Sequence, residues 1–491
     1  MSNSASSFLG IDIGTSSVKA VVVDGEQNIL AGASAPLAVS RPQDLWSEQN
    51  PEDWWVAVGQ AIAGLRHKAG NAWHEVKAIG LSGQMHGAVL LDAAGHPIRP
   101  AILHNDGRAH AEAAWLNAKL PGIGAIAGVP AMPGFSAPKL LWLARHEPEV
   151  FGRARHLLLP KDYARFRMTH GFATDMCDAS GALLLDGAKR QWSPEIAAAA
   201  GIPLSMLPTA LEGSAVSGLL QGSVAMAWGL SPGIIVAAGA GDAAAGAVAS
   251  GAVNGGDAFI SLGTATQYFA ARGTYRPSPE HLIHTFCHAL PGRWFQMAAL
   301  LNGAGALAWA AGLMGRGDIG QLLEDTERAF TGPSALLFLP YLSGERTPHN
   351  NPHAKGVLFG LTPATTPEQV TQAVLEGVAL SLADAQGCLE ATGKLPDRIA
   401  VNGGGSKSRF WMKILASALN KSVLLQEGSE AGPAFGAARL ARLAATGEDV
   451  AAVCSKPEIA AEIRPDPELA QIYAARLQKF RGLYKAVEPL F

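Results

Sequence analysis

Two acidic residues stand where strands are predicted to end, in positions suited to phosphate chemistry. Asp12 lies near the end of the apolar run 8–13, two residues before Gly14, while Asp242 follows the apolar run 234–238 and a Gly-Ala-Gly turn. A carboxylate beside a glycine turn can hold Mg²⁺ against a phosphate, or it can stabilise the turn itself. Asp242 also has the position of a helix N-cap, where the helix dipole would keep it ionised as a proton acceptor. Taken alone, these residues leave a structural and a catalytic role open for each acid.

The segment around Asp12 recurs in the second half of the chain. Ile11-Asp12-Ile13-Gly14-Thr15 has the same design as Ile260-Ser261-Leu262-Gly263-Thr264, an apolar strand that turns at Gly-Thr and resumes as a β-rich stretch. Such a hairpin tip presents N–H groups, and its glycine lets an anion come close. We therefore predict a duplicated fold that binds one polyphosphate from both sides. Because only the first copy carries an acid, the repeat favours a nucleotide-using enzyme.

Three further groups are candidates for binding. Lys19 follows the first turn and can reach a phosphate as a point charge. His86 lies in the loop Gly83-Gln84-Met85-His86-Gly87, whose amide and imidazole suit sugar hydroxyls, although a lone histidine is more often structural. Gly403-Gly404-Gly405 separates a predicted strand from a helix and would let a nucleotide approach the backbone. No GxxxxGK[ST] unit occurs, and no GxGxxG turn joins a predicted strand to a helix, which argues against the two commonest nucleotide-binding folds.

Composition excludes several function classes. At 491 residues the chain exceeds the usual size of one core, so two large domains are expected. The net charge of −3 and the lack of a basic run argue against nucleic acid or a membrane surface as partner. Four scattered cysteines, Cys177, Cys287, Cys388 and Cys454, fit a reducing compartment rather than a disulfide scaffold. With no signal peptide or membrane span predicted, we expect a cytoplasmic protein.

Hydrophobic patterning predicts alternating strands and helices. Strands are expected at 8–13, 18–23, 76–81, 234–238, 257–262, 267–270, 335–339 and 398–401, and 89–92 with 97–100 is expected to form a hairpin. Helices are expected at 50–65, 109–119, 136–146, 194–200, 303–314, 319–329, 367–390, 407–419, 433–445 and 466–487. We place an N-terminal domain at 1–253, a C-terminal domain at 254–450 and a helical tail at 451–491.

Taken in this order, the motifs resemble those of the FGGY family of carbohydrate kinases over about 9–441. Two long signatures are nearly whole, one from Gly134-Phe135-Ser136 through Lys139 to His146 and one from Gly356 to Glu376. The resemblance implies an α/β protein with the actin-like ATPase (ribonuclease H-like) fold, built as two duplicated domains around a central cleft. Shorter stretches, such as Leu159-Pro160-Lys161-Asp162-Tyr163 and 340–352, are most similar to members that phosphorylate D-xylulose.

The resemblance also implies roles for individual residues. Asp242 would be the general base and Asp12 the essential acid, both near Mg²⁺ and counted here as its candidate ligands. The expected sugar site comprises Gln84, Met85, His86, His104, Asn105 and Asp242. The expected ATP site comprises Gly14, Thr15, Ser16, Lys19, Gly263, Thr264, Gly403, Gly404 and Gly405. The implied reaction is ATP-dependent phosphorylation of a ketopentose, first of all D-xylulose, in an enzyme that relatives suggest is a homodimer.

Three departures from the family pattern bear on the substrate. Ala243 replaces the usual asparagine after the catalytic acid, His104 replaces the usual tryptophan before Asn105, and the second phosphate turn reads Gly263-Thr264-Ala265-Thr266. The first two leave another ketose or a pentitol, such as ribulose, as an alternative substrate. A non-catalytic sugar or nucleotide sensor of the same fold is a further alternative, which the two retained acids disfavour.

Overall fold

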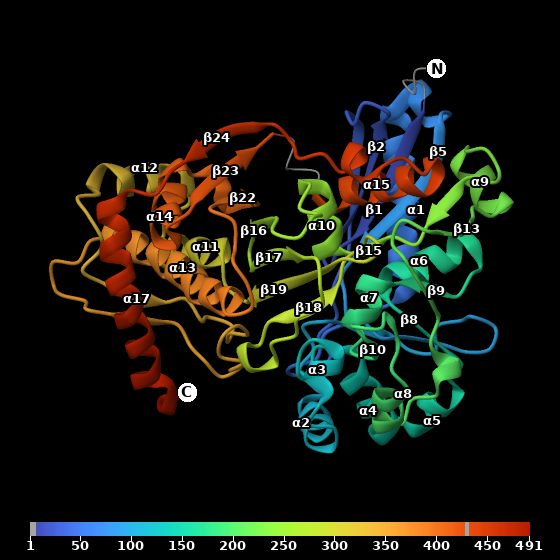
Figure 1. Ribbon diagram of the computed structural model, residues 1–491, viewed down its shortest axis with the longest axis horizontal. Helices are drawn as coiled ribbons and strands as arrows, with labels where there is room; N and C mark the ends of the chain where they lie inside the picture. The colour runs from blue at the N-terminus through green and yellow to red at the C-terminus, as the bar shows by residue number, and fades with distance from the viewer. Residues whose placement is uncertain (1–5, 428–431) are drawn as a thin grey trace.

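The computed structural model describes residues 6–427 and 432–491 and divides them into two α/β domains that lie side by side (Figure 1). Each domain is built on a mixed seven-stranded sheet. No helix in the described ranges is both long and apolar enough to cross a membrane. The four cysteines are free, and three of them are buried.

The first sheet has the order β13-β14-β5-β1-β2-β3, and β15 also pairs with β5. Its centre is the antiparallel hairpin β1–β2, rich in the β-branched residues that favour strands. Next to it, β5 and β14 run parallel to β1. The strand bounds are β1 Ser7–Ile13, β2 Ser17–Asp24, β3 Ile29–Pro36, β5 Val76–Gly83, β13 Val216–Leu219, β14 Ile235–Ala237 and β15 Ala240–Gly241.

The second sheet repeats this topology in the order β18-β19-β17-β16-β22-β23-β24. The antiparallel run β19-β17-β16 corresponds to β3-β2-β1, and the parallel pair β22-β23 corresponds to β5-β14. The bounds are β16 Ala258–Leu262, β17 Thr266–Arg272, β18 His284–Cys287, β19 Trp294–Leu300, β22 Arg398–Asn402, β23 Ser422–Gln426 and β24 Ile459–Ile463. The duplication predicted from the two Gly-Thr turns is therefore confirmed at the level of strand order.

Helices pack on both sheets. In the first domain α1 (Pro51–Ala69) packs on β2 and β3, with Asn50 as its N-cap and proline at its first position, as predicted. In the second domain the largest helix is α13 (Pro367–Glu390), whose N-terminus has a complete capping box. The other helices here are α11 Ala304–Leu313, α12 Ile319–Ala329, α14 Arg409–Leu419 and the tail helix α17 Pro467–Val487, which packs on α13 and α14.

One late helix returns to the first domain. The helix α15 (Gly432–Thr446) packs on β1, β5 and α10 (Asp242–Ser250), and Figure 1 shows it beside the first sheet although it follows the second in sequence. Gly10 in β1 and Gly80 in β5 allow this approach, since a Cβ built on either would overlap a carbonyl oxygen of α15. The helix therefore ties the end of the second half of the chain to the first sheet.

Shorter elements complete the first domain, and in Figure 1 α2, α3, α4, α5 and α8 lie below its sheet while α9 lies beside β13. The short helices are α2 His110–Lys119, α3 Ile123–Ala127, α4 Ser136–His146, α5 Pro148–Arg153, α6 Pro160–Thr169, α7 Met176–Gly181, α8 Pro194–Ala200 and α9 Gly222–Trp228. The short strands are β4 Glu48–Gln49, β6 Val89–Leu91, β7 Ala101–Ile102, β8 His156–Leu158, β9 Ala173–Asp175, β10 Leu185–Asp186, β11 Gln191–Trp192 and β12 Thr209–Leu211. The second domain also has the short hairpin β20 Leu337–Leu339 and β21 Val357–Phe359, and the helix α16 Val450–Val453 follows α15.

One expectation about local structure is met only in part, and another was wrong. In the hairpin of 89–92 with 97–100, Leu91 and Pro97 form an antiparallel bridge and the N–H of Ile98 donates to the carbonyl of Leu90 at 3.1 Å. The segment 97–100 is not a full strand, however, and β6 also pairs with β8. The two prolines of 97–100, Pro97 and Pro100, have no N–H to donate to a strand partner. Asp242 is not an N-cap but the first residue of α10, and Gly241 has the cap position.

Candidate active site

Both domains line one large cleft of about 1370 Å³. The first domain contributes Lys19 and Asp242, while the second contributes the ends of β16 and β22. The lining residues from the second domain include Ser261, Ala265, Gln267, Asn402, Gly403 and Gly404. The predicted catalytic acid and the predicted nucleotide turn thus face the same space from opposite domains.

Asp12 lies near the end of β1, with Lys19 of β2 as its partner on one side and Ser82 of β5 on the other. The carboxylate is almost wholly buried, and its Oδ1 has no hydrogen-bond partner among the described residues. Burial raises the pKa of Asp12 to about 6, although the charge of Lys19 and the nearby Ser82 hydroxyl oppose the rise. A buried carboxylate oxygen without a partner is costly, so a turn-stabilising role alone does not account for Asp12.

Asp242 begins α10, at the positive end of the helix dipole. Its Oδ1 accepts a hydrogen bond of 2.7 Å from the N–H of Ala243. Burial, followed by the negative charge of Asp12, raises the pKa of Asp242 to about 7. A carboxylate with a pKa near neutrality is suited to accept a proton from a hydroxyl group.

The two acids meet across a single strand. Asp12 pairs with Ser82 on one side of β5, and Ala240, two residues before Asp242, pairs with Ser82 on the other. Two strand spacings place the backbones of β1 and β15 about 10 Å apart. The negative charge of Asp12 contributes to the raised pKa of Asp242. The structure therefore brings the two predicted catalytic acids to one edge of the first sheet.

The first hairpin tip presents part of the predicted phosphate site. The N–H of Gly14 donates to the carbonyl of Ser17 at 3.0 Å and closes the turn, while Ser16 and Lys19 are exposed. The Thr15 hydroxyl instead donates to Oε1 of Gln84 at 3.0 Å. The side chains of Ser16 and Lys19 are accordingly the ones that the tip leaves open to a ligand, whereas the hydroxyl and the carbonyl of Thr15 are bonded to Gln84 and Gln49.

The second hairpin tip lies beside the glycine turn. Thr264 is exposed, and the Gly263 carbonyl accepts from the N–H of Ala304 at 2.7 Å, where α11 begins. Gly403 has φ of 93°, and a Cβ there would meet the Leu262 carbonyl oxygen at 2.6 Å, so only glycine fits. Gly404 has open space around it, whereas Gly405 is buried against Leu262. The predicted nucleotide residues Gly263, Thr264, Gly403, Gly404 and Gly405 thus lie together.

The predicted sugar residues Met85 and His86 lie beside the start of α10 and the end of α7. Met85 packs against Gly241, where an added Cβ would be 2.5 Å from its Cγ. His86 has a positive φ of 67°, and its Nδ1 lies 2.7 Å from the carbonyl oxygen of Gly181 at the end of α7. Burial and the charges of Lys139 and Arg346 hold the pKa of His86 well below its usual value. The imidazole is therefore neutral and can both donate and accept a hydrogen bond.

Gln84 has a different environment from its two neighbours. Its Oε1 accepts from Thr15, and its Nε2 donates to Oε1 of Gln49 at 2.9 Å. Gln49 in turn accepts from the indole N–H of Trp54 and donates to the carbonyl of Thr15 at 2.8 Å. Both ends of the Gln84 amide have protein partners, so this side chain holds the first hairpin tip in place.

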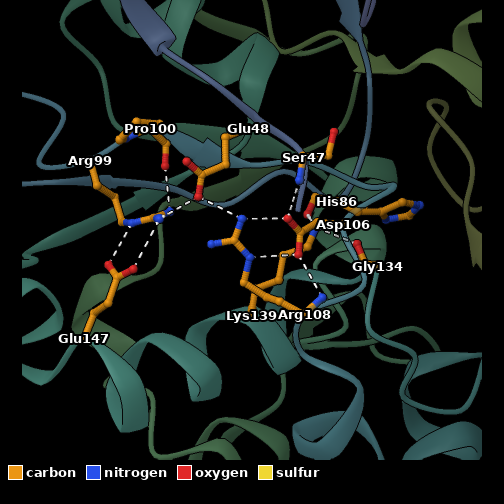
Figure 2. A network of polar contacts seen from close by, with 10 residues as sticks. All are labelled: Ser47, Glu48, His86, Arg99, Pro100, Asp106, Arg108, Gly134, Lys139 and Glu147. Atoms are coloured by element: carbon orange, nitrogen blue, oxygen red, sulfur yellow. Dashed lines mark hydrogen bonds and ion pairs between the residues drawn. The ribbon is translucent and has the colours of Figure 1, made fainter. Parts of the chain in front are cut away.

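His104 and Asn105 begin a loop that is fixed by a buried network of charges (Figure 2). Asp106 accepts from the N–H of Ser47 at 2.6 Å and forms a two-pronged ion pair with Arg108. Arg108 also contacts Glu48 at 2.8 Å, and its guanidinium lies 3.5 Å from the centre of the Trp46 ring. His104 is half-buried, and its Nδ1 has no partner in the part of the chain that the structure describes, whereas Asn105 is exposed.

Lys139 is a site residue that the sequence did not identify by role. Its ammonium donates to the carbonyl oxygens of His86 at 2.8 Å and Gly134 at 2.6 Å, as Figure 2 shows. Arg346 of the second domain donates to the carbonyl oxygen of His104 at 3.4 Å. The signal for Lys139 was its place in a long signature, but its contacts depend on the tertiary fold.

A second acidic cluster lies apart from the cleft. Asp162, Asp175 and Asp178 form the one metal-like group of three or more ligands among the described residues. The Lys161 ammonium contacts these acids at 2.5, 2.6 and 3.1 Å, so its charge occupies the place of a cation. Asp175 also caps α7, whose last residue, Gly181, contacts His86.

Comparison with known proteins extends over nearly the whole chain. The FGGY family of carbohydrate kinases matches it twice, with the N-terminal domain over residues 7–249 and the C-terminal domain over residues 258–445. A xylulose kinase from Escherichia coli K12 is 45% identical over 485 residues, which are 98% of this chain and 99% of that protein. A xylulose kinase from Klebsiella pneumoniae is 44% identical over 484 residues, 98% of this chain and 99% of that protein.

Solved structures give the same result. A kinase from Brucella ovis, described as a xyloylose kinase, has a TM-score of 0.94 at 44% identity and covers 99% of this chain and 100% of its own. A xylulose kinase from Rhodospirillum rubrum has a TM-score of 0.90 at 30% identity, with 99% of both chains covered. The predicted actin-like fold with two duplicated domains is confirmed.

Proposed function

This chain belongs to the FGGY family of carbohydrate kinases, and from that premise we propose that it transfers the γ-phosphoryl group of ATP to the terminal hydroxyl of D-xylulose, giving D-xylulose 5-phosphate. The observation that carries the proposal is the pair Asp12 and Asp242 at one edge of the first sheet, beside a cleft that the second domain also lines. Full-length relatives with the name xylulose kinase support the choice of sugar.

Asp242 is the group that accepts the hydroxyl proton. Its pKa of about 7 leaves a large ionised fraction at neutral pH, and the N-terminus of α10 favours the charged form. Phosphoryl transfer passes through a loose transition state, so positioning and charge neutralisation contribute most of the acceleration. Met85 and His86 hold the sugar against Asp242, while Gly14, Ser16, Lys19, Gly263, Thr264 and the turn 403–405 surround the nucleotide. Closure of the two domains would exclude water from the reacting atoms.

Mg²⁺ fits the residues at this edge of the sheet. The buried Oδ1 of Asp12 is a hard oxygen ligand that accepts no hydrogen bond from residues 6–427 or 432–491, and the carboxylate of Asp242 lies nearby. When bound, Mg²⁺ neutralises charge on the phosphates of ATP. Asp12 and Asp242 are the residues that would hold it.

Steady-state assays of ADP release with D-xylulose and ATP test the proposal. We expect turnover by the native protein and a loss of at least about 100-fold in kcat for Asp242→Asn, since removal of a general base typically costs this much. Asp53→Asn is the matched control, because Asp53 is an exposed acid in the first turn of another helix, α1. Near-normal turnover of Asp242→Asn would remove the residue from its role.

The substrate assay needs a second sugar. Ala243 and His104 depart from the pattern that the family resemblance implies, so D-ribulose belongs in the same panel. A higher kcat/KM for D-ribulose than for D-xylulose would show that the protein is a sugar kinase whose preferred substrate is D-ribulose. We also propose a cytoplasmic homodimer, which light scattering of the purified protein and fractionation of cells would check.

A further inference from the structure

We infer that His284, contributed by the second domain, is a sugar-binding residue that hydrogen-bonds a hydroxyl group of the substrate together with His86. The inference rests on the proposed sugar kinase function and adds a ligand to its sugar site. It starts from a buried imidazole whose two nitrogens have no hydrogen-bond partner among the described residues.

His284 is the first residue of β18 and lies at the contact between the domains. The N–H of Cys287 in the same strand donates to the Ser180 hydroxyl of α7 at 3.1 Å. The N–H of Thr285 donates to the carbonyl oxygen of Gly128 in the first domain at 3.0 Å. These two bonds hold β18, and with it His284, against the first domain.

The His284 ring lies next to the predicted sugar residue. Its centre is 6.5 Å from that of His86, and both rings contact Phe135. A hydroxyl oxygen about 2.8 Å from a nitrogen of each ring spans this separation. A neutral imidazole offers one donor and one acceptor, as a hydroxyl does, so the two groups are complementary.

Leaving such a ring buried without partners is unfavourable. An unmade hydrogen bond at a buried polar group destabilises the folded protein, and His284 is only 1% exposed. Burial, with the charge of Arg346, lowers its pKa to about 3, so the ring stays neutral and does not gain an ion-pair partner. Its neighbours Phe135 and Phe286 offer no polar atoms on their side chains.

His104 is a second histidine near Arg346 with a ring nitrogen that no described residue bonds. Nδ1 of His104 is also buried without a partner among the described residues, and Arg346 lowers the pKa of His104 as it does that of His284. Arg346 thus lies near two imidazoles, each with a buried nitrogen that is unmatched within the described ranges.

The matched control lies four residues further along the chain. His288 is as deeply buried as His284, and burial likewise lowers the pKa of its ring, to about 4. Its nitrogens, however, have partners, since Nε2 lies 3.4 Å from the carbonyl oxygen of Ala252 and Nδ1 accepts from the N–H of Leu290 at 3.3 Å. Replacing His288 therefore tests the loss of a buried imidazole with protein partners, and replacing His284 tests the loss of one whose nitrogens are left for a ligand.

The experiment compares His284→Phe, His284→Gln and His288→Phe in steady-state kinetics with D-xylulose. We expect His284→Phe to raise KM for the sugar at least tenfold while KM for ATP changes less than twofold. His284→Gln should recover part of the loss because its amide can still donate and accept. His288→Phe should leave both KM values close to those of the native protein. Thermal unfolding of each variant confirms that it is folded.

Monodeoxy substrates identify a bound hydroxyl. With 1-, 3- and 4-deoxy-D-xylulose, the penalty of His284→Phe should disappear for one analogue, because the hydroxyl that His284 binds is already missing. An equal penalty for all three analogues, or an unchanged KM for D-xylulose, would overturn the inference and leave His284 bound to a structural water only. If the native protein itself does not turn over D-xylulose, the proposed function fails instead.

Discussion

Asp12 and Asp242 lie on opposite sides of Ser82 in β5, close enough for the charge of Asp12 to raise the pKa of Asp242. The pKa of each acid is raised mainly because neighbouring elements bury its carboxylate. The pair exists because β1, β5 and β15 are adjacent and end at the same edge of the sheet.

The pair predicts a steep loss of activity in acid. Asp242 must be ionised to accept a proton, and its pKa is about 7, while that of Asp12 is about 6. We expect kcat/KM for the sugar to fall about tenfold per pH unit below 7 and more steeply below 6, with both inflections belonging to the coupled pair. Rates measured from pH 5 to pH 9, with the coupling enzymes in excess, check this. A flat profile between pH 5.5 and pH 8 would contradict the assignment of Asp242.

The same shift predicts that Asp242→Asn is more stable than the native protein at high pH. The folded state holds the Asp242 proton more tightly than the unfolded chain does, because its pKa is raised from 3.8 to about 7. This contribution to stability is therefore complete below pH 3.8 and is lost as the pH rises through 7. Asparagine cannot ionise, so we expect a gain on the order of 1–3 kcal/mol at pH 8.

Urea unfolding of both proteins at pH 8 and pH 5.5 measures the difference. The gain of Asp242→Asn should shrink as the pH falls, since the native carboxyl becomes protonated. Asp53→Asn is again the control and should show no gain that depends on pH in this way. A variant that loses both activity and stability at pH 8 would show that the carboxylate is needed by the fold rather than by the reaction.

Much of this architecture follows from local patterns. The hairpin around Gly14, its copy around Gly263 and the helix capped by Asn50 have sequence signals within a few residues, and all three are confirmed. The segment 97–100 was predicted as the second strand of a hairpin, but it pairs with β6 only at its start, because its two prolines remove donors from the ladder.

The contacts between distant segments could not be predicted. Nothing in the sequence around His284 marks a strand that reaches the other domain. The bonds of that strand, from Thr285 to Gly128 and from Cys287 to Ser180, depend on tertiary structure. In the same way, the apolar pattern of α15 predicts a helix but not its return to the first sheet. Gln84 was predicted from its neighbours Met85 and His86, but its amide is directed to Thr15 and Gln49.

The close approach of α15 predicts an unusual sensitivity at Gly80. A Cβ on this residue would overlap the carbonyl oxygen of Ala437, so Gly80→Ala must displace the helix from the sheet. We expect a loss of at least about 2 kcal/mol in the free energy of unfolding. Gly59→Ala is the control, because Gly59 is within α1 and has nothing within 4 Å of its added Cβ. Alanine should stabilise that helix by roughly 0.5–1 kcal/mol. Equal changes in the free energy of unfolding for the two variants would show that α15 does not pack closely against Gly80.

In the buried cluster around Lys161, we expect a second substitution to restore part of the stability that a substitution of Lys161 removes. Lys161→Met removes the ammonium from three carboxylates that are wholly buried, Asp162, Asp175 and Asp178. Breaking a buried ion pair from one side costs about 3–5 kcal/mol, since the other charge is left without compensation.

Asp178→Asn in the same chain removes one of those charges, so the double variant should regain part of the lost stability. Urea unfolding of the native protein, both single variants and the double variant gives the coupling energy between the two residues. Because Asp175 caps α7 and the end of α7 contacts His86, we also expect KM for the sugar to rise in Lys161→Met and to recover in the double variant. Additive effects of the two substitutions on stability would show that Lys161 does not neutralise Asp178.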